Sequence, residues 1–211
     1  MRLYIMRHGE PPWNVLRRFQ GRSDIPLNEK GVALAEMTAK GLADVPFDIG
    51  FTSPLKRARR TAEIVLAGRN VPLMDEERLV EIAFGPYEGM TALPSEHNPD
   101  PDPNMIRFIR DPANYITPEG AESIPELCAR ARGYLEDLCH NAALADKTVL
   151  LATHGGVTTA LLNAIDPPEG YFWRKGVPYN CSYAIVDVRN GVPELVAENQ
   201  ICYPRPENRY K

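Results

Sequence analysis

The stretch Tyr4-Ile5-Met6-Arg7-His8-Gly9-Glu10 decides how this chain folds. An apolar run over residues 3–6 ends abruptly in an arginine, a histidine and a glycine. The same order returns at residues 148–156, where a second apolar run ends in His154 and two glycines. A short, continuous apolar run bounded by glycine is typical of a strand buried on both faces, as in parallel sheets. We therefore predict two such strands, each ending in His-Gly.

The ends of these two strands predict an anion site. In open parallel sheets, ligands bind just beyond the carboxyl ends of the strands. His8 and His154 would meet at that edge, together with the guanidinium group of Arg7. Gly9 lets the backbone approach a ligand closely, and a neutral histidine can act as a covalent nucleophile. Such a cluster is suited to bind and attack a dianionic phosphate.

The composition limits the classes of function. The chain has 211 residues, 44% of them hydrophobic and 25% charged, which is ordinary for a globular protein with a sizeable core. Its formal net charge of −4 argues against a nucleic-acid partner, since proteins that bind nucleic acids are usually basic. No segment reaches the ~20 apolar residues of a membrane span. The cysteines form no CxxC pair and no secretory signal is evident, so we expect a cytoplasmic protein with reduced thiols.

Strands that alternate with helices predict the architecture. Helices are expected after an Asn28 cap, after Ser53-Pro54, and from a Ser123 capping box to about Leu144. The expected fold is α/β, a three-layer α/β/α sandwich whose central sheet is mostly parallel. Further helices are expected at residues 105–109 and 157–165, and strands at residues 2–6, 48–52, 71–74, 147–153, 182–188 and 195–198, the last two as a hairpin.

Two regions lie outside this alternation. Residues 9–27 have the composition of a long loop, and such loops inside a compact domain usually carry function. Prolines cluster at residues 94–118, which we interpret as an irregular cap, about residues 90–120, over the ends of the strands. We predict a single domain over residues 1–211.

Two further segments hold candidate site residues. Arg57 lies on the first turn of a predicted helix, where free backbone N–H groups and the helix dipole favour an anion. Glu81 lies among apolar neighbours in residues 79–89, where a raised pKa would suit it to general acid catalysis. Glu88 is the competing candidate in the same loop. A solvated basic face and a surface glutamate are the alternative interpretations.

Arg7-His8-Gly9-Glu10, with Asn14 after it, resembles the signature of the histidine phosphatase superfamily, also called phosphoglycerate mutase-like. Residues 19–31 resemble the next block of that family, and residues 53–58 with Thr61-Ala62 resemble the block of its second arginine. Residues 79–89 resemble its acid block, and residues 153–156 its second-histidine block. The blocks stand in the family's order and span nearly the whole chain, which makes the resemblance specific.

The resemblance implies a role for each of these residues. His8 would be the nucleophile that becomes phosphohistidine, and Glu81 would protonate the leaving alkoxide and then assist the attacking water. His154, the third catalytic residue, would hold phosphoryl oxygens. The substrate-binding residues that the resemblance implies are Arg7, Asn14, Gln20, Gly21, Arg57 and Gly155.

The acid block is similar to that of the phosphatase branch of the family. This implies a metal-independent phosphomonoesterase that acts on a small phosphorylated metabolite without a cofactor. A bisphosphoglycerate-dependent phosphoglycerate mutase is the alternative, because the cap offers Arg107 and Arg110. A non-catalytic protein that binds phosphorylated ligands is a more distant alternative.

Three features lie outside the resemblance. Pro11-Pro12 stands where the family commonly has serine or threonine, which leaves the path of this loop open. His97 and His140 are expected at the surface. The aromatic run at residues 171–173 could pack against a second copy of the chain, as in a homodimer, or inside the core or cap.

Overall fold

The structure is a computed structural model that describes residues 1–94, 99–170, 172–174 and 176–205. At its centre is a six-stranded sheet in the order β3-β2-β4-β1-β5-β6. Strands β3, β2, β4 and β1 run parallel, and β5 and β6 are antiparallel at one edge. The mostly parallel sheet is confirmed, with β3 starting two residues later than predicted. The strands are β1 (Arg2–Arg7), β2 (Ile49–Thr52), β3 (Leu73–Asp75), β4 (Thr148–Thr153), β5 (Tyr183–Arg189) and β6 (Val192–Gln200).

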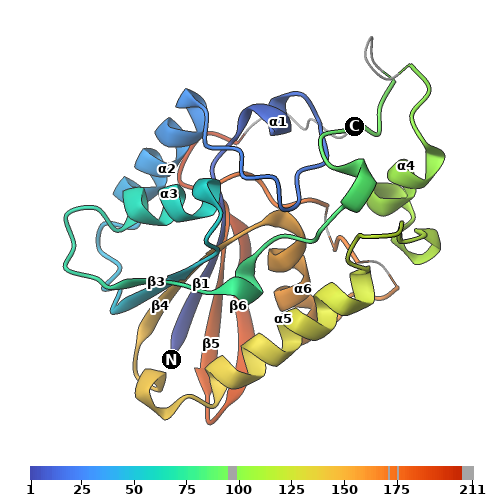
Figure 1. The fold of residues 1–211 in the computed structure, drawn as a ribbon. Coiled ribbons are helices and arrows are strands. Elements are labelled where there is room, and N and C mark those ends of the chain that lie inside the picture. Colours follow the sequence, from blue (N-terminus) through green and yellow to red (C-terminus); the bar gives the residue numbers. More distant parts are fainter. Residues whose placement is uncertain (95–98, 171, 175, 206–211) are drawn as a thin grey trace.

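Helices cover both faces of the sheet (Figure 1). Leu3 and Ile5 of β1 pack in one core with two helices, α5 and α6, whereas Tyr4 and Met6 pack in another with α3. Because successive side chains of a strand point to opposite faces, one apolar run contributes to both cores. The three-layer α/β/α sandwich is thus confirmed. The long helices are α2 (Glu29–Gly41) and α3 (Lys56–Val65) on one face, and α5 (Ile124–Cys139) and α6 (Gly155–Ile165) on the other.

Two of the predicted helix caps are confirmed. The Asn28 side chain accepts the backbone N–H of Gly31 at 2.7 Å at the start of α2. Ser123 and Glu126 form a reciprocal capping box at the start of α5. Helix α5 nevertheless ends at Cys139 and not near Leu144. Asn141 caps a separate turn, η4 (Ala142–Leu144), which breaks the predicted helix.

The predicted cap of α3 is wrong. Pro54 and Leu55 remain outside the helix, since Leu55 has an extended backbone with ψ of 132°. Helix α3 therefore begins at Lys56, and the side chain of Asp24 accepts the Lys56 N–H at 2.7 Å. The Ser53 hydroxyl, directly after β2, accepts the N–H of Leu55 at 3.3 Å and none from within the helix.

The loop at residues 9–27 is more ordered than predicted, because it contains the helical turn α1 (Pro12–Val15). Pro12 at the first helical position already has the φ that a helix requires. The region expected as a cap contains α4 (Pro103–Arg110). None of the described helices combines the length and apolar character needed to cross a bilayer. The remaining short turns are η1 (Glu77–Leu79), η2 (Gly85–Tyr87) and η3 (Pro112–Asn114).

Phe172 and Trp173 of the aromatic run pack against this cap. The indole N–H of Trp173 donates to the Phe108 carbonyl at 2.7 Å, and the two rings meet edge to face at 5.4 Å between centroids. Phe172 packs edge to face on Trp173, whereas Tyr171 lies outside the described residues, as does His97. His140 is exposed at the end of α5, as predicted.

Candidate active site

His8 lies at the end of β1 and is 4% exposed. Its Nδ1 lies 2.6 Å from the carbonyl oxygen of Gly9. A carbonyl can only accept, so Nδ1 carries the proton and Nε2 keeps a free lone pair. Burial, followed by the charges of Arg57 and Arg7, lowers the pKa of His8 well below its usual 6.5. The ring is therefore neutral near pH 7, with a lone pair on Nε2.

His154 lies beside His8 because β4 and β1 are adjacent parallel strands that pair Arg7 with Thr153. The two ring centroids are 5.1 Å apart. The Nε–H of Arg57 donates to His154 Nδ1 at 3.2 Å, so Nε2 carries the proton and donates to Ser53 Oγ at 2.8 Å. Burial and the charge of Arg57 lower the pKa of His154 well below 6.5. The site thus holds two neutral imidazoles in opposite tautomers.

Arg57 is fully buried at the start of α3. Besides His154, it donates to the carbonyls of Ser23 at 2.8 Å and Gly21 at 2.6 Å. Burial lowers its pKa to about 10, which still leaves it charged at neutral pH. Three of the five N–H groups of this guanidinium donate to these acceptors, which leaves two that an anion placed beside Arg57 would satisfy.

Arg7 is held at both ends of its guanidinium. It donates to Asn14 Oδ1 at 3.0 Å and to the carbonyl of Pro178. Its buried Nε has no hydrogen-bond partner among the described residues. Gly155 adjoins it, since a methyl group on Gly155 would lie 3.6 Å from this nitrogen. A buried N–H without a partner is costly, so Arg7 offers a donor that an anion would satisfy.

Glu81 reaches the same place from the segment after η1. Its carboxyl group accepts N–H groups from Ile82 at 3.0 Å, Gly156 at 3.0 Å and Val157 at 3.3 Å. The last two belong to the first turn of α6, which begins directly after His154. Burial raises the pKa of Glu81 although these hydrogen bonds act against it. A buried carboxyl with a raised pKa can hold the proton that a leaving group needs.

Glu88, the competing carboxylate, has a different place. It accepts N–H groups from Gly21 at 3.2 Å and Arg22 at 2.9 Å, and the hydroxyl of Ser23 at 2.7 Å. Arg57 binds the carbonyls of the same loop. Glu88 therefore orders the loop that holds Arg57, and it is Glu81 that lies at α6.

Gln20 and Gly21 differ in what they offer to a substrate. The Gln20 side chain is buried, and neither its oxygen nor its nitrogen has a partner among the described residues. A methyl group on Gly21 would lie 2.1 Å from the Ile82 carbonyl oxygen and 2.3 Å from the Glu88 carboxylate. Gly21 is thus required by close packing and by its contact with Arg57, whereas Gln20 has hydrogen-bonding capacity left for a ligand.

Alanine at Gly21 should destabilise the protein and lower its activity. The added methyl must displace backbone at Ile82, and overpacking of this kind costs typically 1–3 kcal/mol. Thermal unfolding should therefore shift to lower temperature, and kcat should fall because Arg57 loses its acceptor. Gly133→Ala is the matched control, because nothing lies within 4 Å of its added methyl group in the middle of α5. It should stabilise the protein by about 0.5–1 kcal/mol. Equal melting temperatures for the two variants would contradict this account.

Three site residues were not predicted. Ser53 contacts His154. Thr61 accepts the Gly9 N–H at 2.9 Å and donates to the Arg57 carbonyl at 2.6 Å. Asn180 donates to the carbonyls of His8 and Gly9 at 3.2 Å each. Ser53 and Thr61 stand in the second-arginine segment, which could have suggested them, but no local pattern marks Asn180.

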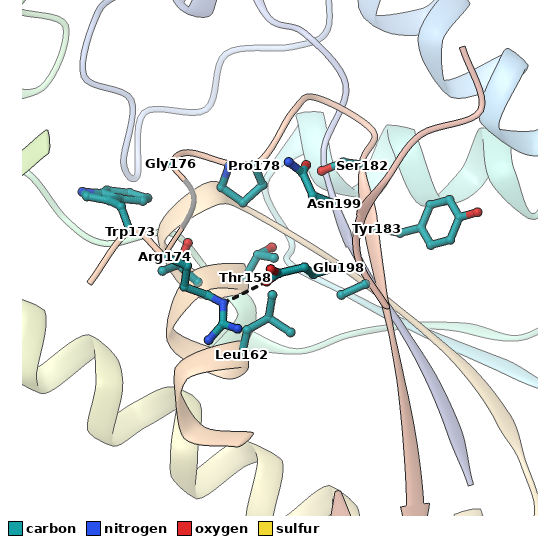
Figure 2. A pocket seen from close by; sticks show the side chains of 12 residues that line it. Thr158, Leu162, Trp173, Arg174, Gly176, Pro178, Ser182, Tyr183, Glu198 and Asn199 are labelled. Atoms are coloured by element: carbon teal, nitrogen blue, oxygen red, sulfur yellow. Dashed lines mark hydrogen bonds and ion pairs between the residues drawn. The ribbon is translucent and has the colours of Figure 1, made fainter. Parts of the chain in front are cut away.

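A pocket lies beside α6 (Figure 2). Thr158, Arg174 and Glu198 line it, and the latter two form an ion pair at 2.9 Å. None of the predicted site residues is part of its described lining. Pro178 links the two regions, because it lines the pocket while its carbonyl accepts an N–H of Arg7. Over the described part of the chain, no group of three or more His, Cys, Asp or Glu side chains is arranged to hold a metal ion.

Comparison with known proteins gives a consistent picture. The family model of the histidine phosphatase superfamily (branch 1) matches residues 3–201. A relative from Arabidopsis thaliana named "Probable 2-carboxy-D-arabinitol-1-phosphatase" is 36% identical over 190 residues, 88% of this chain but 38% of that protein. The chain therefore spans well under half the length of that relative.

Two other matches extend over nearly all of both chains. The "Adenosylcobalamin/alpha-ribazole phosphatase" of Salmonella typhimurium is 30% identical over 209 residues, 98% of this chain and 100% of the relative. The solved structure titled "Bacillus stearothermophilus YhfR" has a TM-score of 0.83 at 35% identity and covers 95% of this chain and 97% of that chain. Proteins named as phosphoglycerate mutases are similar as well.

Proposed function

The chain belongs to the histidine phosphatase superfamily, branch 1, and we propose that it is a metal-independent phosphatase that hydrolyses a small phosphorylated metabolite through a phosphohistidine at His8. One observation carries the proposal: a neutral His8 with a free Nε2 lies among charged guanidinium groups that still have N–H donors to offer. The four free cysteines agree with a reducing compartment, and we place the activity in the cytoplasm.

In the first step, His8 Nε2 attacks the phosphorus and the bond to the leaving oxygen breaks. Glu81 gives its proton to that oxygen, so that the product leaves as a neutral alcohol. The phosphoryl group has at most two negative charges near neutral pH. Arg7 and Arg57 supply positive charge where negative charge develops, which is the main requirement of phosphoryl transfer.

In the second step, water attacks the phosphorus of phosphohistidine. The Glu81 carboxylate takes a proton from this water, and His8 leaves with its Nε2 lone pair restored. Inorganic phosphate and the protonated Glu81 are then the products of the step, so the enzyme returns to its starting state. Asn14 supports Arg7 throughout, and Gln20 has its amide available for the rest of the substrate.

A panel of phosphorylated metabolites tests the proposal. The wild type should release inorganic phosphate from at least one monoester at an unchanged rate in the presence of a chelator. Denaturation at alkaline pH should trap phosphate on the protein, because the P–N bond of phosphohistidine is labile in acid but stable in base, and His8→Ala should remove both signals. Absence of turnover with tight binding of a phosphorylated ligand would instead indicate a non-catalytic binder.

The mutase is the second candidate because several relatives carry that name. Arg107 and Arg110 of α4, the cationic residues that suggested it, are exposed. Interconversion of 3- and 2-phosphoglycerate faster than release of phosphate would favour the mutase. Release of phosphate faster than interconversion would favour the phosphatase.

A further inference from the structure

The hydroxyl group of Ser53 lies against a catalytic histidine and has no assigned part in the reaction. Ser53 directly follows β2 and is fully buried. Its Oγ lies 2.8 Å from His154 Nε2 and 3.3 Å from the backbone nitrogen of Leu55. The contact with Leu55 is one that a helix cap would make, whereas the contact with His154 links Ser53 to the site.

A role as helix cap does not account for this contact. Helix α3 begins at Lys56, and the first N–H of the helix goes to Asp24. The Leu55 N–H, at 3.3 Å, is the longer of the two contacts of Ser53 Oγ. The shorter contact therefore belongs to His154, which lies 101 residues away in sequence.

The position of each proton follows from Arg57. A guanidinium nitrogen can only donate, so His154 Nδ1 must accept the Arg57 N–H at 3.2 Å. A neutral imidazole then carries its proton on Nε2, and Ser53 Oγ is its acceptor. Without Ser53, this buried N–H would lose the partner that the structure gives it, and a buried donor without a partner is costly.

We infer that Ser53 is a positioning residue for His154, whose neutral ring it holds in a single orientation, between Arg57 and its own hydroxyl, before substrate binds. The inference rests on the proposed phosphatase function. Both nitrogens of this ring have protein partners, so the ring and the Arg57 guanidinium bound to it keep one arrangement during phosphoryl transfer. Preorganised groups of this kind stabilise a transition state more than a ground state. Ser53 should therefore act on kcat more than on KM.

Ser53→Ala tests this with two measurements on the full chain. Imidazole ¹⁵N NMR of the free protein reports the tautomer of His154 and the exchange of its Nε2 proton with water, with its signals assigned by their loss in His154→Asn. We expect the Nε2–H tautomer in both proteins, because Arg57 still donates to Nδ1. The Nε2 proton should exchange slowly in the wild type and clearly faster in Ser53→Ala, where it has lost its acceptor. In the kinetic measurement, kcat should fall roughly 3- to 10-fold, as for loss of one neutral hydrogen bond, with KM changed less than about twofold.

Thr38→Val is the matched control, because it also removes a fully buried hydroxyl, one that donates to the carbonyl of Leu34 within α2. It should leave the exchange of the His154 Nε2 proton and kcat unchanged. Unchanged exchange of this proton in Ser53→Ala, or a fall in kcat no larger than that of Thr38→Val, would overturn the inference. Because the NMR measurement needs no substrate, it decides on Ser53 even if the wild type were to hydrolyse nothing.

Discussion

His8→Ala is expected to lower kcat by at least about 10³-fold on every phosphomonoester that the wild type hydrolyses. The substitution removes the atom that forms the covalent intermediate, and loss of a nucleophile is among the most costly changes to an enzyme. Arg7, Arg57 and Glu81 would remain, so binding of substrate should persist. KM, or a dissociation constant for inorganic phosphate, should therefore change far less than kcat.

The exposed His140 provides the matched control for this experiment. His140→Ala removes an imidazole at the end of α5, outside the site, and should leave both kcat and the trapped phosphoenzyme unchanged. Retention of more than a tenth of wild-type kcat in His8→Ala would exclude His8 as the nucleophile. Phosphate trapped on His154 in that variant would instead assign the attack to the second ring.

Glu81→Gln is expected to have the second largest effect, and the effect should depend on the leaving group. Glutamine keeps an oxygen that can accept an N–H group but has no proton to transfer. For an alkyl phosphate, whose leaving oxygen must be protonated, kcat/KM should fall by about 10²–10³, within the range typical of general acids. For p-nitrophenyl phosphate, which leaves as a stable anion, the rate of phosphoenzyme formation should fall far less.

The pH dependence of kcat/KM follows from His8 and Glu81. His8 must be neutral, and its pKa is lowered well below 6.5, so kcat/KM should not decline at the usual pKa of histidine as the pH falls. Glu81 must be protonated, and burial raises its pKa above 4.5, so kcat/KM should decline as the pH rises through that pKa. Glu81→Gln should abolish this decline of kcat/KM at higher pH.

Glu77→Gln is the control for Glu81→Gln, since Glu77 is exposed in η1 a few residues away. Its pH profile and its rates on both classes of substrate should match those of the wild type. An equal loss on alkyl and nitrophenyl phosphates in Glu81→Gln would mean that Glu81 does not serve as the proton donor.

The order of residues in the sequence was sufficient to predict the central strands and two of the helix caps. The apolar runs before His8 and His154 predicted two central parallel strands, because a strand covered on both faces needs apolar side chains in succession. Parallel strands that are neighbours end at one edge, so the two histidines had to come close wherever β1 and β4 paired. The caps at Asn28 and Ser123 are local as well, because each involves atoms only three residues apart.

The choice between Glu81 and Glu88 could not be made in this way. Both carboxylates lie in one segment, and both have apolar and glycine neighbours in sequence. The difference is that Glu81 meets the first turn of α6, whereas Glu88 meets the backbone of residues 21–23. Those partners are 60 or more residues away and depend on how the layers pack.

The amino-acid sequence by itself determined the sheet, its two histidine-bearing strands and the family, because these depend on short apolar runs and on motifs whose residues are neighbours. Only the tertiary structure decided that Ser53 holds His154, that Asn180 binds the backbone of His8, and that Arg57 divides its donors between the loop and the site. Hydrogen bonds of this kind need atoms within about 3 Å in a definite direction. No periodicity in a sequence encodes that condition for residues a hundred positions apart, and packing of the three layers alone brings them together.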